Sequence, residues 1–125
     1  MVTARQKIIY LSQTYEGKVH DKKITDEEPL SFNQPIELLQ DSGFKGHNPK
    51  NAIVKEPHKN SKLKKLTEEQ KVENTAQASQ RVIVEHAICG TKRLRIVKDI
   101  YRNKRETIDI AMAIACGLHN LRIAA

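Results

Sequence analysis

Aromatic residues are scarce in this sequence. Only 4% of its 125 residues are aromatic and none is tryptophan, so Ile, Leu, Val and Ala must supply most of the core volume. A chain of this length has enough apolar surface for one domain and little to spare. We therefore expect a single domain, residues 1–125, with a thin core.

Cysteines and long apolar runs are also few. The two cysteines, Cys89 and Cys116, lie in apolar helical patterns without C-x-x-C spacing, which is typical of small core residues in a reducing compartment. No run of about 18 apolar residues is available to cross a membrane, and no signal peptide follows Met1. Zinc-ligand spacing, a Ser-His-Asp set and a phosphate loop are absent from the sequence. We therefore expect a cytoplasmic protein that has no membrane partner.

The net charge of +7 is unevenly distributed. Residues 1–44 carry five Lys and Arg against seven Asp and Glu, whereas residues 45–125 carry seventeen against eight. Positive charge confined to one region favours a polyanionic partner, most often nucleic acid, because binding releases counterions from the phosphates. A Lys-rich surface that only improves solubility is the alternative.

Short apolar runs predict strands. These runs cover residues 7–12, 36–40 and 52–55. The first has the β-branched and aromatic composition of a strand buried on both faces. Residues 57–66 have no apolar periodicity and should form a basic loop, and residues 93–97 should form a strand or a turn.

Helices are expected between and after these strands. Asp21 is a good N-cap type and should open a short helix. Thr67 and Gln70 have the spacing of a capping box, so a long helix should begin there and end near Gly90. A final helix over residues 107–121 is apolar over most of its surface and must pack against something large. Short strands mixed with helices indicate the α/β or α+β class.

Asp41 closes the apolar segment of residues 38–40 just before a turn that contains Gly43 and Gly46. This position favours the tip of a strand. Two-metal phosphoryl transfer needs several carboxylates that converge on one point, because Mg²⁺ and Mn²⁺ prefer hard oxygen ligands. An Asp that only initiates the turn is the other interpretation.

Glu85 lies in a helical pattern among the apolar residues Val82, Val84 and Ile88. A carboxylate in such surroundings is expected to be partly buried, where it needs a partner or a metal ion. Glu85 also follows Arg81 by four residues, so an ion pair on a solvated helix face competes with the metal-binding interpretation.

Cations alternate with apolar residues in the segment from Lys92 to Lys98. One interpretation of this pattern is a groove for the DNA backbone that includes Lys92, Arg93 and Arg95. An amphipathic segment that keeps its Lys and Arg head groups in water is the alternative.

Five short motifs occur in a fixed order along the chain. They are Gly17-Lys18-Val19-His20-Asp21, Asp41-Ser42-Gly43-Phe44-x-Gly46, Lys55-x-Pro57-His58-Lys59, Arg81-x-x-x-Glu85-His86 and Ala115-x-Gly117-Leu118-His119-Asn120-Leu121-Arg122. With these motifs, from about residue 7 to its end, the chain resembles the C-terminal part of a bacterial insertion-sequence DDE transposase.

The resemblance implies a ribonuclease-H-like fold, in which a mixed sheet of short strands is flanked by helices. It also implies an Asp-Asp-Glu triad that binds two Mg²⁺ or Mn²⁺ ions and cuts and joins DNA at transposon ends. Asp41 matches the second Asp and Glu85 matches the Glu, so these two are the expected catalytic residues and metal ligands. The candidate DNA-binding residues are Lys55, Lys59, Arg81, Lys92, Arg93 and Arg95. Full-length transposase subunits are further expected partners.

The first Asp of the triad has no match in this sequence. No strand that ends in Asp precedes Lys7, and the Asp of the His20-Asp21 motif is not usually assigned to the triad. The resemblance therefore implies an incomplete domain, truncated at its N-terminus and without its first core strands, that is inactive alone. The alternatives are a non-catalytic basic DNA-binding remnant that modulates a full-length transposase, and an unfolded remnant.

Overall fold

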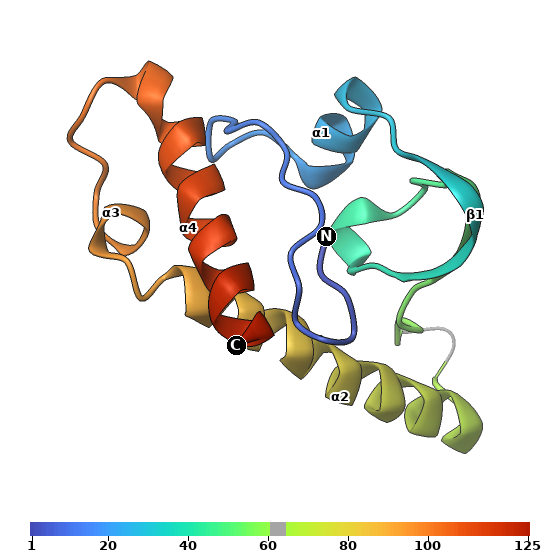
Figure 1. Cartoon of the computed structure of the whole chain (residues 1–125). Helices are drawn as coiled ribbons and strands as arrows, with labels where there is room; N and C mark the ends of the chain where they lie inside the picture. The colour runs from blue at the N-terminus through green and yellow to red at the C-terminus, as the bar shows by residue number, and fades with distance from the viewer. Residues whose placement is uncertain (61–64) are drawn as a thin grey trace. The chain divides into compact units, whose positions relative to one another are not determined.

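The computed structural model describes residues 1–60 and 65–125, and the chain divides into two compact units. We call Met1–Thr14 with Ser79–Ala125 the terminal unit, and Tyr15–Ala78 the central unit. The elements drawn in Figure 1 are α1 (Asp21–Glu27), β1 (Ser31–Leu39), η1 (Ser42–Phe44), β2 (Lys50–Lys55), α2 (Glu68–Thr91), α3 (Arg95–Lys98), η2 (Arg105–Thr107) and α4 (Ile108–Ala124). The mixed α/β class is confirmed.

In the central unit, β1 and β2 pair in parallel, and the part of the chain that the structure describes contains no other strand. Leu38 lies opposite Val54, and Leu39 opposite Lys55. Pro35 lies within β1 where the register shifts, a position that suits a residue without a backbone N–H. The strands predicted at residues 36–40 and 52–55 are therefore confirmed, although both begin earlier than predicted.

The long helix α2 begins as the sequence predicts. The backbone N–H of Thr67 donates to Oε1 of Gln70 at 3.1 Å, and the backbone N–H of Gln70 donates to Oγ1 of Thr67 at 3.2 Å. This reciprocal pair is a capping box. α2 crosses the boundary between the two units, which lies between Ala78 and Ser79.

The helix ends near Gly90, as the sequence predicts, although α2 continues through the glycine to Thr91. Gly90 has a packing role within the terminal unit: a Cβ atom at this position would collide with the imidazole ring of His119 on α4. The glycine therefore allows α2 and α4 to approach closely.

Residues 93–97 were expected to be a strand or turn, and Arg95–Lys98 form the short helix α3 instead.

The strand predicted at residues 7–12 does not form. This segment contains only an isolated antiparallel bridge between Val2 and Ile8, and Ile9 is 54% exposed. The reason is that the backbone of Ile8 pairs with a side chain: its N–H donates to Oδ1 of Asn120, and its C=O accepts from Nδ2 of the same residue. The backbone of Ile8 is therefore bonded to the Asn120 side chain and not to a neighbouring strand.

The core is thin, as the composition predicts. Among the described residues, the buried hydrophobic ones are the small Ala87, Ala115 and Cys116. Cys116 is thus a core residue as expected, whereas Cys89 is exposed and its predicted burial is wrong.

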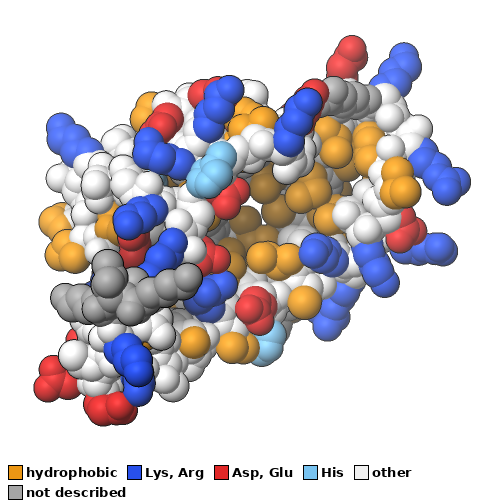
Figure 2. Space-filling view, turned by 180° about the vertical axis from the view of Figure 1, so that it is seen from behind, with side chains coloured by type: hydrophobic (Ala, Val, Ile, Leu, Met, Phe, Trp, Pro, Cys, Tyr) orange, Lys and Arg blue, Asp and Glu red, His pale blue; other side chains and the backbone are white. Residues whose placement is uncertain are grey.

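Hydrophobic side chains are also exposed on the surface, and several appear on the face of the molecule drawn in Figure 2. Exposed large hydrophobic residues on α4 are Ile110, Ile114, Leu118 and Leu121. No helix in the described ranges has the length and hydropathy of a membrane span.

Candidate functional site

Asp41 lies just past the end of β1 and starts the η1 turn, as the sequence predicts. It is exposed, and its Oδ1 accepts a hydrogen bond of 2.7 Å from the backbone N–H of Ser42. The preceding Gln40 fixes this end of the sheet: its backbone N–H donates to the C=O of Lys55 at 3.1 Å, and its Nε2 donates to the C=O of His47 at 3.0 Å. The Asp41 carboxylate therefore projects from a turn that is bonded to the neighbouring strand.

The first turn of α1 packs against the same loop. The Asp21 carboxylate approaches Gly43 so closely that a Cβ on Gly43 would lie 2.5 Å from Oδ2 of Asp21. Gly46 has φ +85°, in the left-handed region that glycine tolerates, and the Lys22 side chain lies beside it. The two glycines of the turn therefore have separate roles: Gly43 leaves space for Asp21, and Gly46 supplies the backbone conformation.

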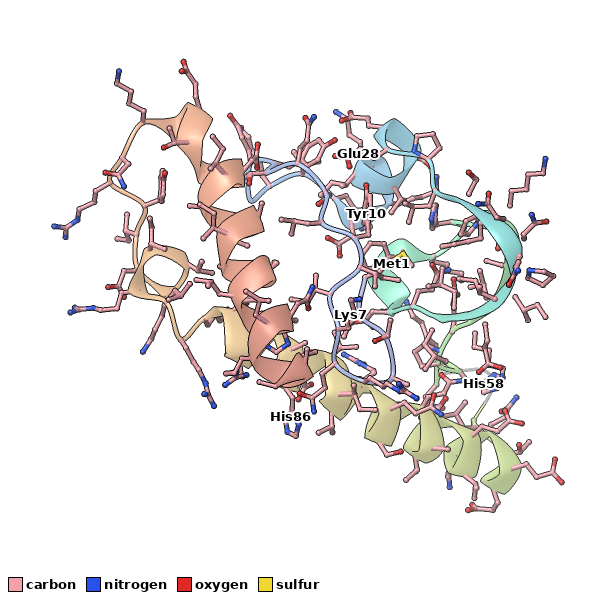
Figure 3. All side chains as sticks on the ribbon, viewed as in Figure 1. Met1, Lys7, Tyr10, Glu28, His58 and His86 are labelled. Atoms are coloured by element: carbon pink, nitrogen blue, oxygen red, sulfur yellow. The ribbon has the colours of Figure 1, made fainter. Side chains whose placement is uncertain are left out.

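Glu85 lies on α2 within the terminal unit and is exposed, so the predicted partial burial is wrong. Its apolar neighbours Val82, Val84 and Ile88 are themselves 43%, 39% and 44% exposed, because this part of α2 has little protein packed over it. His86, which follows Glu85, points outward from α2 in Figure 3. The Glu85 carboxylate has no hydrogen bond or ion pair with another described residue.

The two candidate metal ligands belong to different units, Asp41 to the central unit and Glu85 to the terminal unit. Their carboxylate oxygens are of the hard type that Mg²⁺ and Mn²⁺ bind, so the donor chemistry fits these ions. Within residues 1–60 and 65–125, no three His, Cys, Asp or Glu side chains are grouped so that they could hold a metal ion. Each unit thus presents one of the two predicted ligands.

Three of the predicted DNA-binding cations gather around one pocket of the terminal unit. Lys92, Arg93 and Arg95 line an open pocket of about 530 Å³ where α2 ends and α3 begins. The pocket is also lined by Cys89, Lys98 and Asp99. Nε of Arg95 lies 3.3 Å from Oδ2 of Asp99, so one of the three cations has an acidic neighbour. Sequence reasoning placed Cys89 in the core and so missed its position beside these cations.

The other predicted DNA-binding cations do not share this pocket. Lys55 is in the central unit and pairs with Glu37 across the two strands, at 2.8 Å. Lys59 is exposed in the loop after β2, and Arg81 is exposed on α2. Lys55 is therefore partly neutralised by Glu37, whereas Lys92 and Arg93 sit in a surface rich in positive charge.

The described part of the loop predicted at residues 57–66 is attached to α2. The backbone N–H of His58 donates to Oδ1 of Asn74 at 2.8 Å, and Nδ2 of Asn74 donates to the C=O of His58 at 2.9 Å. Nε2 of His58, labelled in Figure 3, also lies 2.8 Å from a carboxylate oxygen of Glu73. Residues 61–64 of the predicted loop lie outside the described residues.

Positive charge is concentrated in one unit. The terminal unit has eleven Lys and Arg against four Asp and Glu, whereas the central unit has eleven of each. The whole net charge of +7 therefore belongs to the terminal unit. Long-range attraction of a polyanion acts on this unit, because a neutral unit exerts little net field.

A protein-family comparison matches almost the whole chain. The model of the DDE superfamily endonuclease family matches residues 1–120. No curated protein and no solved structure matches the chain.

Proposed function

We propose that this chain, which belongs to the DDE superfamily endonuclease family, is a transposase-type domain that takes part in metal-dependent cleavage and transfer of DNA strands. Endonucleases of this superfamily act on DNA and use divalent metal ions. The observation that carries the residue assignment is the place of Asp41, an exposed carboxylate on the turn at the end of β1. The mixed α/β arrangement with its parallel strand pair is consistent with part of a ribonuclease-H-like fold.

In this proposal, Asp41 and Glu85 are metal ligands. Both are exposed, so their carboxylates are accessible to a divalent ion from the solvent. Asp41 and Glu85 would hold Mg²⁺ or Mn²⁺, which would supply positive charge for the phosphoryl oxygens and for activation of the attacking hydroxyl. The protein's own contribution is to fix the carboxylates: Asp41 through the Ser42 N–H and Glu85 through its place on α2.

Only two carboxylates of the three in the triad have matches in this chain, so we expect the chain alone to bind metal weakly and to leave DNA uncut. Isothermal calorimetry with Mn²⁺ tests the ligand assignment. Asp41→Ala and Glu85→Ala should each lower the Mn²⁺ affinity by at least about tenfold. Glu106→Ala, which removes an exposed carboxylate elsewhere in the terminal unit, is the matched control and should leave the affinity unchanged. Equal affinity in all four proteins would contradict the assignment.

A second function, non-catalytic DNA binding, is favoured by a separate observation: the terminal unit carries the whole net charge and gathers Lys92, Arg93 and Arg95 at one pocket. This function would let the chain compete for DNA with a full-length transposase or associate with its subunits. It needs neither Asp41 nor Glu85, so binding to duplex DNA should survive Asp41→Ala and Glu85→Ala.

Salt dependence measures the contribution of the cations. The logarithm of the DNA affinity should fall linearly with the logarithm of salt concentration, and each phosphate contact removed should reduce the slope by about one. Lys92→Ala and Arg93→Ala should each have this effect. Lys71→Ala, in the neutral central unit where Lys71 pairs with Glu68 at 2.7 Å, should leave the slope unchanged. A slope that responds equally to all three substitutions would refute a localised contact surface.

A further inference from the structure

Asp21 belongs to the His20-Asp21 motif and is not one of the proposed metal ligands. The fold nevertheless places it beside the turn that follows Asp41. It is the first residue of α1, and its carboxylate lies against Gly43, two residues after Asp41. A Cβ on Gly43 would be 2.5 Å from Oδ2 of Asp21 and 3.5 Å from its Cγ. Real Cβ atoms essentially never approach other atoms to 2.5 Å, so with a larger residue at position 43 the Asp21 carboxylate would have to shift away from the turn.

The turn that Asp21 touches also determines where the Asp41 carboxylate lies. The backbone N–H of Ser42 donates to Oδ1 of Asp41 at 2.7 Å, and the N–H of Phe44 donates to the C=O of Asp41 at 3.0 Å. Gly43 lies between these two donors. A shift of Gly43 therefore moves the hydrogen bonds that hold Asp41.

Asp21 has a simpler role as well, because a carboxylate in the first turn of a helix is favourable beside the helix dipole. That role does not require contact with Gly43. Asp21 is exposed and its side chain has no hydrogen bond or ion pair with another described residue, so the contact with the turn is the distinguishing interaction of this side chain. We propose that Asp21 is a positioning residue, which packs against Gly43 and thereby fixes the turn that carries Asp41.

The functional test rests on the proposed role of Asp41 as a metal ligand and uses the affinity for Mn²⁺. Asp21→Ala should lower this affinity roughly tenfold, the lower end of the effect of residues that support metal ligands. Asp21→Asn keeps the shape of the side chain and should restore the wild-type affinity. Glu27→Ala removes a carboxylate at the other end of α1, where it pairs with Lys23 at 3.7 Å, and should leave the affinity unchanged.

Three results would overturn the proposal. An unchanged affinity in Asp21→Ala would show that the contact does not support Asp41. An equal loss in Asp21→Asn would show that the negative charge acts, and not the packing. An equal loss in Glu27→Ala would show that any weakening of α1 is sufficient.

A measurement without metal separates this proposal from the assignment of Asp41. In the ¹H–¹⁵N NMR spectrum, Gly43→Ala should displace the Ser42 amide resonance further in the otherwise wild-type chain than in the Asp21→Ala chain, because only in the former does the added Cβ meet the Asp21 carboxylate. The double variant Gly43→Ala/Asp21→Ala should return it towards its wild-type position. If Mn²⁺ binding does not depend on Asp41, the metal assignment fails, while this resonance still decides whether Asp21 positions the turn. An equal displacement of the Ser42 resonance by Gly43→Ala in the presence and absence of the Asp21 carboxylate would refute the contact.

Discussion

The side chain of Asn120 binds the backbone of Ile8 at two points. The N–H of Ile8 donates to Oδ1 of Asn120 at 2.8 Å, and Nδ2 of Asn120 donates to the C=O of Ile8 at 2.7 Å. The neighbouring His119 adds a contact of 3.0 Å between its Nε2 and the C=O of Gln6. These contacts attach the N-terminal segment to α4, so that two side chains replace the strand that this segment would otherwise need.

Asn120→Ala should therefore destabilise the terminal unit. The substitution removes both partners of Ile8 from a partly buried position, and we expect a loss of about 1–3 kcal/mol in the free energy of unfolding. Urea denaturation followed by circular dichroism measures the loss. Asn103→Ala, at an exposed loop position, is the control and should change the stability by less than about 0.5 kcal/mol. A similar small change for Asn120→Ala would mean that water replaces the amide without cost.

The sequence predicted the features that depend on near neighbours. Thr67 and Gln70 cap α2 because both partners lie within one turn, and Asp41 follows β1 because an apolar run stops there. The segment around Ile8 has the composition of a buried strand. Its actual partner, Asn120, is 112 residues away, and no periodic pattern reports a side chain that binds a distant backbone.

The exposure of Glu85 and the role of Gly90 were missed for the same reason. Apolar neighbours predict burial only if another element covers them, and Val82 and Ile88 remain substantially exposed. Gly90 has the residue type of a helix end, but its contact with His119 depends on where α4 packs. The contact of Asp21 with Gly43 joins two separate elements, so it also depends on packing that no local pattern reports.

Two helical glycines should respond oppositely to alanine. Gly90→Ala adds a Cβ that collides with His119, and overpacking of this kind costs about 1–3 kcal/mol. At Gly117 of α4 a Cβ meets no atom within 4 Å, so Gly117→Ala should stabilise the helix by about 0.5–1 kcal/mol through its higher helix propensity. Thermal unfolding of the two variants gives the sign of each change. Stabilisation of the Gly90→Ala protein would contradict the packing assigned to Gly90, and destabilisation of the Gly117→Ala protein would contradict the open space assigned to Gly117.

The two cysteine thiols should differ in reactivity. Cys89 is exposed beside Lys92 and Arg93, whereas Cys116 is 8% exposed on α4. Burial raises the pKa of the Cys116 thiol, so less of the reactive thiolate is present near neutral pH. An aromatic disulfide reagent should therefore label one thiol of the native chain quickly and the second only after denaturant is added.

Single variants assign the two labelling phases. Cys89→Ser should remove the fast phase, and Cys116→Ser should remove the phase that requires denaturant. Rapid reaction of both thiols in the native chain would show that the packing around α4 opens on the time scale of labelling.

The phenol of Tyr15 should titrate at unusually high pH. Its hydroxyl donates a hydrogen bond of 2.9 Å to Oε1 of Glu28, which follows the last residue of α1 and is labelled in Figure 3. This hydrogen bond, with smaller contributions from desolvation and from the Glu28 charge, raises the pKa of Tyr15 from 10.0 to about 12. Because the pKa of Tyr15 is higher in the folded chain, the hydrogen bond contributes its full stability below about pH 10, and this contribution is lost as the pH rises through about 12.

Ultraviolet absorbance of the phenolate measures the titration of Tyr15. Tyr15→Phe should remove a step near pH 12, and Glu28→Gln should move that step towards pH 10. A titration curve that neither substitution changes would refute the bond between Tyr15 and Glu28.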